Sequence, residues 1–329
     1  MSADSGTSVV EPDLPVIDSH HHLWVHHGDR YLIEEFAADA ASGHRIVASV
    51  FVECGAMLRR HGPPEFRTVG EVEFAAGIAA MSESGLYGPT RICAAIIGRA
   101  DLQVGARVGE VLDALAAAGG GRFRGIRSPT VWDADPALNL GVRPYAPPGL
   151  LLDPTYREGF ARLAERDLVY EAWQFFPQLP DLCGLADAFP ETAIVVNHCG
   201  GLVGLNAYAG LETFPRWKAF VTEVARRPNT LMKIGGLSGR RCGFGLQERA
   251  TPPAAEDLAR LWRPYVETCI ELFGPSRCLF ESNFPPDRAA GSYRTVWNGL
   301  KLAVAGCSAE EKRDLFSETA RRVYRLDLP

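Results

Sequence analysis

Eight short apolar runs, rich in β-branched residues, alternate along the chain with longer segments in which apolar residues recur every three to four positions. The runs are Val16–His22, Val47–Glu53, Ile92–Gly98, Phe123–Ser128, Leu168–Phe175, Ile194–His198, Leu231–Gly236 and Cys278–Asn283. Strands that alternate with helices predict parallel pairing, because each crossover between parallel strands needs a dozen or more residues. Eight such units predict a fold of the α/β class, and within that class a closed (β/α)8 TIM barrel.

The segments between the runs are expected to form helices outside the barrel. Helical periodicity is clearest over Val69–Met81, Leu102–Ala118, Thr155–Arg166, Pro215–Arg227 and Leu258–Phe273, and a last helix is expected over Ser308–Leu326. Thr155 with Glu158, and Ser308 with Glu311, have the spacing of a capping box. No shift in composition divides the chain. We therefore expect one barrel domain over residues 14–329, preceded by a flexible tail over residues 1–13.

Charge and composition narrow the classes of partner. The 34 Lys and Arg residues against 40 Asp and Glu residues give a net charge of −6, which argues against nucleic acid or an anionic membrane as the main partner. No apolar run approaches the ~20 residues that cross a bilayer, and the start of the chain lacks the pattern of a secretory signal. Eight scattered cysteines without a CxxC pair favour reduced thiols. We expect a cytoplasmic protein that acts on a small-molecule substrate. The sequence is also compatible with a homo-oligomer.

The first run ends in the strongest chemical signal, Asp18-Ser19-His20-His21-His22. Because side chains alternate along a strand, Asp18, His20 and His22 are expected on one face, with Asp18 orienting an imidazole. Neutral imidazoles at the carboxyl end of a barrel strand can bind a divalent ion or donate to a developing oxyanion. His198 ends the sixth run before two glycines and is expected at the same mouth.

Three carboxylates lie near strand ends, where burial is costly unless they are paired or coordinated: Glu53, Glu171 and Glu281. They are either part of a functional cluster or ion-pair partners of Arg124, Arg127 or Lys233. Trp173 shares a strand face with Glu171, and Glu281 shares one with Asn283, ahead of Asp287 in the next loop. Arg124 and Arg127, with Arg240, Arg241 and Arg249 after the seventh run, could bind a substrate carboxylate, although solvated surface charge is the simpler interpretation of the loop arginines.

Two Pro- and Gly-rich stretches, over residues 139–154 and 238–253, are expected as long loops at the substrate side of the barrel.

The segments VIDSHHHLW, VFVECGAM, FRGIR, VVNHCGG, KIGGL and FESNFPPD, in that order, resemble the amidohydrolase superfamily. They are most similar to its amidohydrolase-related branch of TIM-barrel hydrolases, which includes lactonases of sugar lactones and of 2-pyrone-4,6-dicarboxylate. The resemblance runs from about residue 14 to residue 326. It implies that His20 and His22 are the strand-1 histidine pair and that His198 is the strand-6 histidine.

The chain departs from the family pattern at the eighth run. Asn283 stands where the family usually has the aspartate that activates water, and a neutral amide cannot take a proton. YEAWQF lacks the strand-5 histidine and FRGIRS lacks a strand-4 lysine, which argues against a binuclear metal site. The resemblance leaves open one divalent ion, most plausibly zinc, held by His20, His22, His198 and Glu53, or a metal-free arrangement.

The sequence thus predicts a hydrolase that opens a lactone of a small carboxylated or hydroxylated substrate. His20, His22 and His198 would polarise the carbonyl, and one of the carboxylates of Asp287, Glu281, Glu171 or Glu53 would replace the absent aspartate as the base. Glu171, Trp173, Arg124, Arg127, Arg240 and Arg241 would contact the substrate. Two alternatives stay open: a metal-dependent decarboxylase of an aromatic acid, and a barrel that has lost catalysis and only binds a ligand.

Overall fold

The computed structural model of the protein describes residues 8–26, 28–139 and 144–328. All eight predicted strands are present and form one parallel sheet in the order β1-β4-β5-β6-β7-β8-β9-β10. Their bounds are β1 (Pro15–His21), β4 (Arg45–Val52), β5 (Arg91–Gly98), β6 (Phe123–Pro129), β7 (Val169–Trp173), β8 (Ile194–Val196), β9 (Thr230–Ile234) and β10 (Cys278–Phe280).

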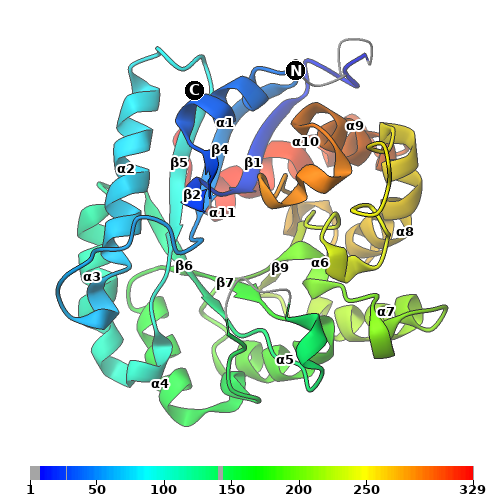
Figure 1. Ribbon diagram of the computed structural model, residues 1–329. Coiled ribbons are helices and arrows are strands. Elements are labelled where there is room, and N and C mark those ends of the chain that lie inside the picture. Colours follow the sequence, from blue (N-terminus) through cyan, green and yellow to red (C-terminus); the bar gives the residue numbers. More distant parts are fainter. Residues whose placement is uncertain (1–7, 27, 140–143, 329) are drawn as a thin grey trace.

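The sheet curls so that the segment after β10 returns to β1. His21 bridges Phe284 in parallel, His22 N donates to Phe284 O at 2.8 Å, and Asn283 N donates to His20 O at 3.0 Å. The architecture is the expected (β/α)8 barrel, with strands inside and helices around them (Figure 1). A short hairpin of β2 (Trp24–His26) and β3 (Asp29–Tyr31) follows the first strand.

The helices follow the strands around the barrel in chain order (Figure 1). They are α1 (Ile33–Ala40), α2 (Val69–Glu83), α3 (Val108–Ala118), α4 (Pro154–Ala164), α5 (Leu179–Ala188), α6 (His198–Gly201), α7 (Thr213–Ala225), α8 (Ala255–Phe273), α9 (Tyr293–Ala303), α10 (Ala309–Arg313) and α11 (Thr319–Val323). A π-helical turn over Asp314–Glu318 joins α10 to α11, so the predicted last helix is interrupted. The predicted segment Leu102–Ala118 is also divided, into a 3-10 turn over Leu102–Arg107 and α3, and Gly105, whose φ is 63°, breaks the helical geometry within that turn.

The two predicted capping boxes have different outcomes. Ser308 Oγ accepts from Glu311 N, and the Glu311 carboxylate accepts from Ser308 N, which confirms the second box. The first is wrong, because α4 begins earlier: Asp153 is the N-cap and accepts from Tyr156 N at 2.8 Å. Pro154 occupies the first helical position, where its lack of an N–H costs no hydrogen bond.

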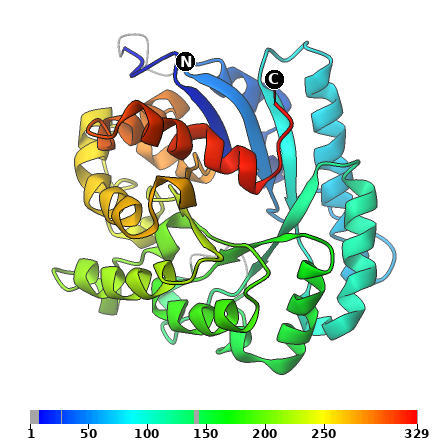
Figure 2. The same cartoon turned by 180° about the vertical axis from the view of Figure 1, so that it is seen from behind.

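The interior of the barrel is apolar toward the amino-terminal ends of the strands. Ile17, Val50, Ile97, Val195 and Leu279 form a buried cluster with side chains from the end of the chain, Ala320, Tyr324 and Leu326. Arg91, the first residue of β5, donates to Asp327 O, which places the chain's end at this side of the barrel. In the view from behind, Figure 2 shows the C-terminal helical segment lying across this end of the barrel. A site for a ligand is therefore left to the opposite, carboxyl-terminal mouth.

Residues 8–13, the described part of the predicted tail, lie against α9. Asn298 accepts from Val10 N and donates to Ser8 O, and Lys301 Nζ donates to Glu11 O at 2.8 Å. Of the predicted loop 139–154, residues 140–143 lie outside the described residues, as do residues 1–7 of the tail. Among the described helices, none combines the length and the apolar composition that a membrane crossing requires.

Candidate active site

Strand β1 brings two of its histidines to the barrel mouth through an irregularity in its pairing. Ile17 faces the barrel interior, and the register with β4 shifts between Asp18 and His21. His20 and His22 then come together, while His21 stacks on Phe36 of α1 with ring centroids 4.1 Å apart. The shift breaks simple alternation along the strand.

Asp18 does not share the face of the histidine rings, so the prediction that it orients an imidazole is wrong. Its carboxylate accepts from Ser282 N at 2.9 Å, from Ser282 Oγ at 2.6 Å and from Tyr293 Oη of α9 at 3.0 Å. Burial raises the pKa of Asp18 to about 6, against the lowering effect of these hydrogen bonds. Asp18 joins strand β1 to the segment after β10 and to a covering helix.

His22 is held in one tautomer by the backbone. Its Nδ1 lies 2.8 Å from Val52 O, and since a carbonyl oxygen only accepts, Nδ1 carries the proton and Nε2 has a lone pair. That Nε2 lies 3.2 Å from Nε2 of His20. The indole of Trp24 stacks on the outer side of His22, with ring centroids 5.8 Å apart.

His20 has a matching arrangement. Arg127 Nη1 lies 3.3 Å from His20 Nε2, and a guanidinium only donates, so this nitrogen too has a lone pair and the proton is on Nδ1. Burial lowers the pKa of both His20 and His22 well below the usual value, with nearby cationic groups adding to the effect. Two neutral imidazoles therefore face each other through their lone pairs.

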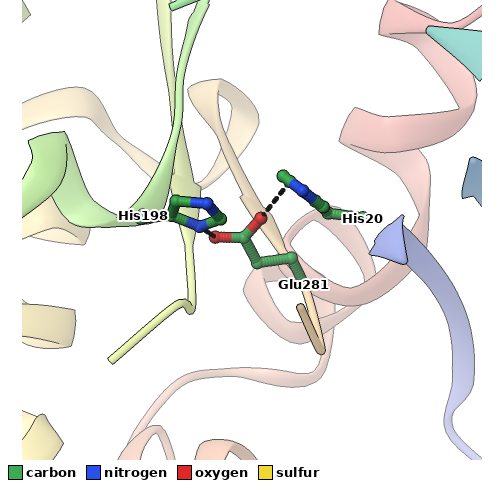
Figure 3. Close-up of side chains that lie close together, drawn as sticks. All are labelled: His20, His198 and Glu281. Carbon is green, nitrogen blue, oxygen red and sulfur yellow. Dashed lines mark hydrogen bonds and ion pairs between the residues drawn. The ribbon is translucent and has the colours of Figure 1, made fainter. Parts of the chain in front are cut away.

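Glu281, directly after β10, lies between two histidines (Figure 3). Its Oε1 is 2.7 Å from Nδ1 of His198, and its Oε2 is 2.7 Å from Nδ1 of His20. The side chains of Glu281 and His20 are fully buried, and that of His198 is 12% exposed. His198 has a φ of 54°, a left-handed conformation that turns its ring toward His20, with ring centroids 4.8 Å apart.

This set of donors fits one divalent cation. Nitrogen and carboxylate atoms of His20, His198 and Glu281 lie within 4.8 Å of one another. Two imidazole nitrogens on a tetrahedral zinc, each about 2.0–2.1 Å from the ion, are roughly 3.3 Å apart. The 3.2 Å between the Nε2 atoms of His20 and His22 matches this separation, whereas the 2.7 Å contacts of Glu281 have the length of hydrogen bonds. The converging lone pairs are thus the part of the site that fits a metal, and Glu281 fits an orienting carboxylate.

The segment after β10 also supplies a second buried carboxylate. Asn283, with a φ of 50°, donates from Nδ2 to Asp287 Oδ1 at 2.8 Å, and Ser238 N donates to Asp287 Oδ2 at 3.2 Å. Burial raises the pKa of Asp287 to about 6; the charge of His198 and both hydrogen bonds oppose this rise. A carboxyl group with this pKa is suited to accept a proton near neutral pH.

For the strand-end glutamates, the sequence left open whether they join a functional cluster or form ion pairs. In the structure, Glu53 pairs with Arg127 and Glu171 pairs with Lys233. Glu53 Oε1 accepts from Arg127 Nε at 2.8 Å, and its backbone oxygen accepts from Arg127 Nη2. The Arg127 guanidinium also lies 5.1 Å from the ring centre of Trp173. Arg127 is thereby placed beside His20, with Trp173 against its guanidinium, and the carboxylate of Glu53 is directed to Arg127.

Glu171 is enclosed deeper in the barrel. Lys233 Nζ donates to both of its oxygens at 2.9 and 2.8 Å, Tyr324 Oη donates to Oε1, and Asn197 Nδ2 donates to Oε2. Both Glu171 and Lys233 are fully buried. This network lies between the site and the chain's end, and the structure does not bring Glu171 to the mouth.

The predicted arginines are divided between the two ends of the barrel. Arg124 donates to the backbone oxygens of Tyr324 and Gly121 and so lies at the amino-terminal end, away from the histidines. Arg240 pairs with Glu248 at the surface.

Arg241 lies at the mouth, among the loops that follow β6, β7 and β8. Its Nε donates to Leu138 O at 3.2 Å, its guanidinium lies 5.8 Å from the ring centre of Phe175, and its backbone oxygen accepts from Gly204 N. Within the described part of the chain it has no carboxylate partner, and burial lowers its pKa.

Three contributors to the site were missed from the sequence: Ser238, Gly235 and Gly236. A Cβ on Gly235 would lie 2.3 Å from Glu281 Cγ, and a Cβ on Gly236 would lie 2.3 Å from His198 Nδ1. The paired glycines at the end of β9 are the signal that could have indicated this close approach. No signal marked Ser238, because its contribution is a backbone N–H.

A parallel barrel with imidazoles and buried carboxylates at its carboxyl-terminal mouth has the arrangement of a TIM-barrel enzyme. A family model described as amidohydrolase matches residues 17–326, and the chain belongs to this family. It is an enzyme of the hydrolase class, as the resemblance of its motifs implied.

Individual relatives give a more detailed comparison. The chain is 30% identical over 338 residues to the uncharacterized protein y4mH of Sinorhizobium fredii, a match covering 95% of this chain and 99% of the relative. It is 28% identical over 241 residues to an L-fucono-1,5-lactonase of Burkholderia multivorans, covering 72% of this chain and 73% of that one. A crystal structure of an amidohydrolase from Burkholderia multivorans with bound zinc superposes with a TM-score of 0.72 at 25% identity, covering 94% of this chain and 99% of that one.

Proposed function

We propose that the protein hydrolyses the ring ester of a small lactone that carries a carboxylate or hydroxyl groups. The observation that carries the proposal is the 3.2 Å approach of the His20 and His22 Nε2 atoms, with the ring of His198 4.8 Å from that of His20. These imidazoles would polarise the carbonyl, and Asp287, whose pKa is influenced by the charge of His198, would activate water. The similarity to an L-fucono-1,5-lactonase supports a lactone as the substrate.

The residues that would hold a divalent ion, for which we propose zinc, are His20, His22 and His198. When bound, such an ion acts as a Lewis acid on an ester carbonyl oxygen.

Asp287 is the residue that we assign as the general base. With a pKa of about 6 it is mostly ionised at pH 7, and its two oxygens are held by Asn283 and by Ser238 N. An oxygen of Asp287 takes a proton from water as the water oxygen bonds to the carbonyl carbon. The same proton then goes to the ring oxygen as the ester C–O bond breaks, which leaves an open hydroxy acid.

Arg241 is the residue that we assign to a substrate carboxylate. The guanidinium of Arg241 is partly buried and has no acidic partner among the residues that the structure describes, and a bidentate carboxylate ligand would offset the cost of that burial. Arg127 lies nearer to the histidines, but its guanidinium is already occupied by Glu53. Arg241 at the rim would therefore hold the substrate's carboxylate, while the ester lies over His20 and His198.

The proposal is tested by hydrolysis of a panel of sugar and dicarboxylate lactones, including L-fucono-1,5-lactone, followed by acid release. We expect the wild-type protein to open at least one member, and His198→Ala to reduce that rate by at least 100-fold. Equal rates for both proteins on every hydrolysed lactone would remove His198 from the chemistry. Carbon dioxide released from aromatic acids, with no lactone opened, would favour the decarboxylase.

The zinc content of the purified protein and of His22→Ala, measured by elemental analysis, tests the proposed ion. We expect about one ion per chain in the wild type and a clear loss in the variant, since His22 has no other role in the proposal than to supply Nε2.

A further inference from the structure

We infer that Glu281 is a positioning residue that fixes the proton of two histidines, His20 and His198, on Nδ1, so that Nε2 of each ring carries a lone pair. The inference concerns the site of the proposed function and rests on it for its consequence, ligand binding at Nε2. One carboxylate directly after β10 would thus determine how His20 of β1 and His198 of α6 present their rings (Figure 3).

The first argument is the geometry of the carboxylate. Its two oxygens each approach one imidazole nitrogen at 2.7 Å, and in both rings that nitrogen is Nδ1. The contact with His198 is a hydrogen bond, and the contact with His20 is an ion-pair contact without hydrogen-bond alignment. A carboxylate oxygen and a bare ring nitrogen would repel each other at 2.7 Å, so both Nδ1 atoms carry a proton. Because an ionised carboxylate only accepts hydrogen bonds, the proton belongs to the ring.

The second argument is independent of Glu281 and applies to His20. Arg127 Nη1 approaches His20 Nε2 at 3.3 Å, and a guanidinium can only donate. The His20 proton is therefore on Nδ1, facing Glu281. Two different neighbours, one on each side of the ring, require the same tautomer.

The third argument is that the backbone is shaped to admit this contact. A Cβ at Gly235 would lie 2.3 Å from Glu281 Cγ and 2.5 Å from Glu281 O, and a Cβ at Gly236 would lie 2.3 Å from His198 Nδ1. Gly236 has a φ of 62°, which an L side chain rarely adopts. The end of β9 thus leaves space for both members of the Glu281–His198 pair.

The consequence is a clear difference between a carboxylate and an amide at position 281. Glutamate offers an acceptor to each ring. Glutamine offers one acceptor and one donor, so with Glu281→Gln only one ring can keep its proton on Nδ1, and the other must present a bare Nδ1 to the amide and move its proton to Nε2. The isosteric variant would therefore withdraw one of the Nε2 lone pairs without creating a cavity.

The experiment is ¹⁵N NMR of histidine-labelled full-length protein after treatment with a chelator, in the wild type and in Glu281→Gln. Protonated and bare ring nitrogens resonate far apart, and His20→Gln and His198→Gln assign the signals. We expect both wild-type rings to carry the proton on Nδ1, and one ring of Glu281→Gln to carry it on Nε2. Glu281→Asp, which keeps two acceptors, should restore the wild-type pattern in any ring that it still reaches.

Zinc binding, measured by competition with a chromophoric chelator, reads out the consequence. Removing an orienting partner of a metal ligand typically weakens binding 10–100-fold, and we expect this loss for Glu281→Gln. Glu71→Gln is the matched control: Glu71 is another fully buried glutamate, and its Oε1 accepts from Cys54 N and Ala56 N, as an amide oxygen also can. It should change neither the His20 and His198 tautomers nor the zinc affinity.

Two results would overturn the inference. One is the finding that the ring of His20 or of His198 carries its proton on Nε2 in the wild-type protein. This measurement can be made even if Glu281→Gln does not fold. The other is a folded Glu281→Gln with both rings still protonated on Nδ1, because Glu281 would then be only structural. A protein with the expected tautomers that binds no zinc or opens no lactone would uphold the inference and contradict the proposed function instead.

Discussion

Asn283 donates from Nδ2 to Oδ1 of Asp287 at 2.8 Å, within a single turn after strand β10. The residue that replaces the usual strand-8 aspartate therefore contacts a carboxylate four positions further along the chain. The left-handed φ of Asn283, 50°, directs its side chain to this contact. An amide at position 283 need not mean lost chemistry, because the proton acceptor can be the residue that it holds.

Replacing Asp287 by Asn should abolish most of the activity. General-base catalysis typically contributes 10²–10⁴-fold, so we expect kcat on the best lactone to fall by about that factor while KM changes little. Far-UV circular dichroism should show an unchanged fold. A variant with more than half of the wild-type kcat would show that the base is elsewhere.

The pH profile should report the same group. Only the ionised form of Asp287 accepts a proton, and burial raises its pKa to about 6, so kcat/KM should be constant above pH 7 and fall tenfold per unit well below pH 6. Asn283→Asp places a second carboxylate beside it, which should raise the apparent pKa of the pair and move the acidic limb to higher pH. New activity in Asn283→Asp, absent from the wild type, would instead favour the barrel that has lost catalysis.

The fold could be predicted almost completely from the alternation of apolar runs and helical segments. All eight strands follow that pattern, because strands buried on both faces must be apolar and each parallel crossover needs a helix. Local detail could not be predicted in the same way. The start of α4 depends on Pro154 at the first helical position, and the interruption of the last helix by a π turn has no evident signal in the sequence.

The site was predictable in its members and less so in their partners. The approach of His20, His22 and His198 follows from strand ends that meet at one mouth. The direction of Asp18 does not follow, because the register shift in β1 cancels the alternation on which that prediction relied. Pairing is also invisible in a single sequence: Glu171 meets Lys233 sixty-two positions away, and only the closed barrel brings them together.

Asp18 should make stability depend on pH in a defined direction. Its folded pKa of about 6 exceeds the ordinary value of about 3.9, so the folded state binds its proton more tightly and the free energy of unfolding falls as pH rises between these values. A shift of about two units corresponds to roughly 2–3 kcal/mol. Asp18→Asn lacks this titration. The free energy of unfolding of the variant minus that of the wild type should therefore increase by roughly that amount between pH 4 and pH 7, measured by urea unfolding at both pH values. A difference between the two proteins that stays constant with pH would contradict this.

Arg241 should determine the preference for carboxylated substrates. Arg241→Gln removes the charge but keeps a donor, so we expect KM for a carboxylated lactone to rise 10–100-fold, in line with a lost charged hydrogen bond of about 1.5–3 kcal/mol. An uncharged lactone is the control substrate, and its KM should change less than twofold. Equal effects on both substrates would mean that Arg241 supports the loops around Leu138 and Phe175 rather than the ligand.

Gly236→Ala tests whether the space beside His198 is required for activity. The added Cβ would lie 2.3 Å from His198 Nδ1 at a φ of 62°, so either the ring or the end of β9 must move. A misplacement of about 1 Å can cost on the order of 100-fold in rate, and we expect kcat/KM to fall by at least that factor, with roughly 1–2 kcal/mol of lost stability from the left-handed backbone. Gly239→Ala is the matched control in the same loop, since Gly239 has a φ of −61° and its Cβ would meet no atom within 4 Å. If both variants kept the wild-type kcat/KM, the contact between β9 and His198 would not limit catalysis, and the orientation of His198 would have to come from Glu281 alone.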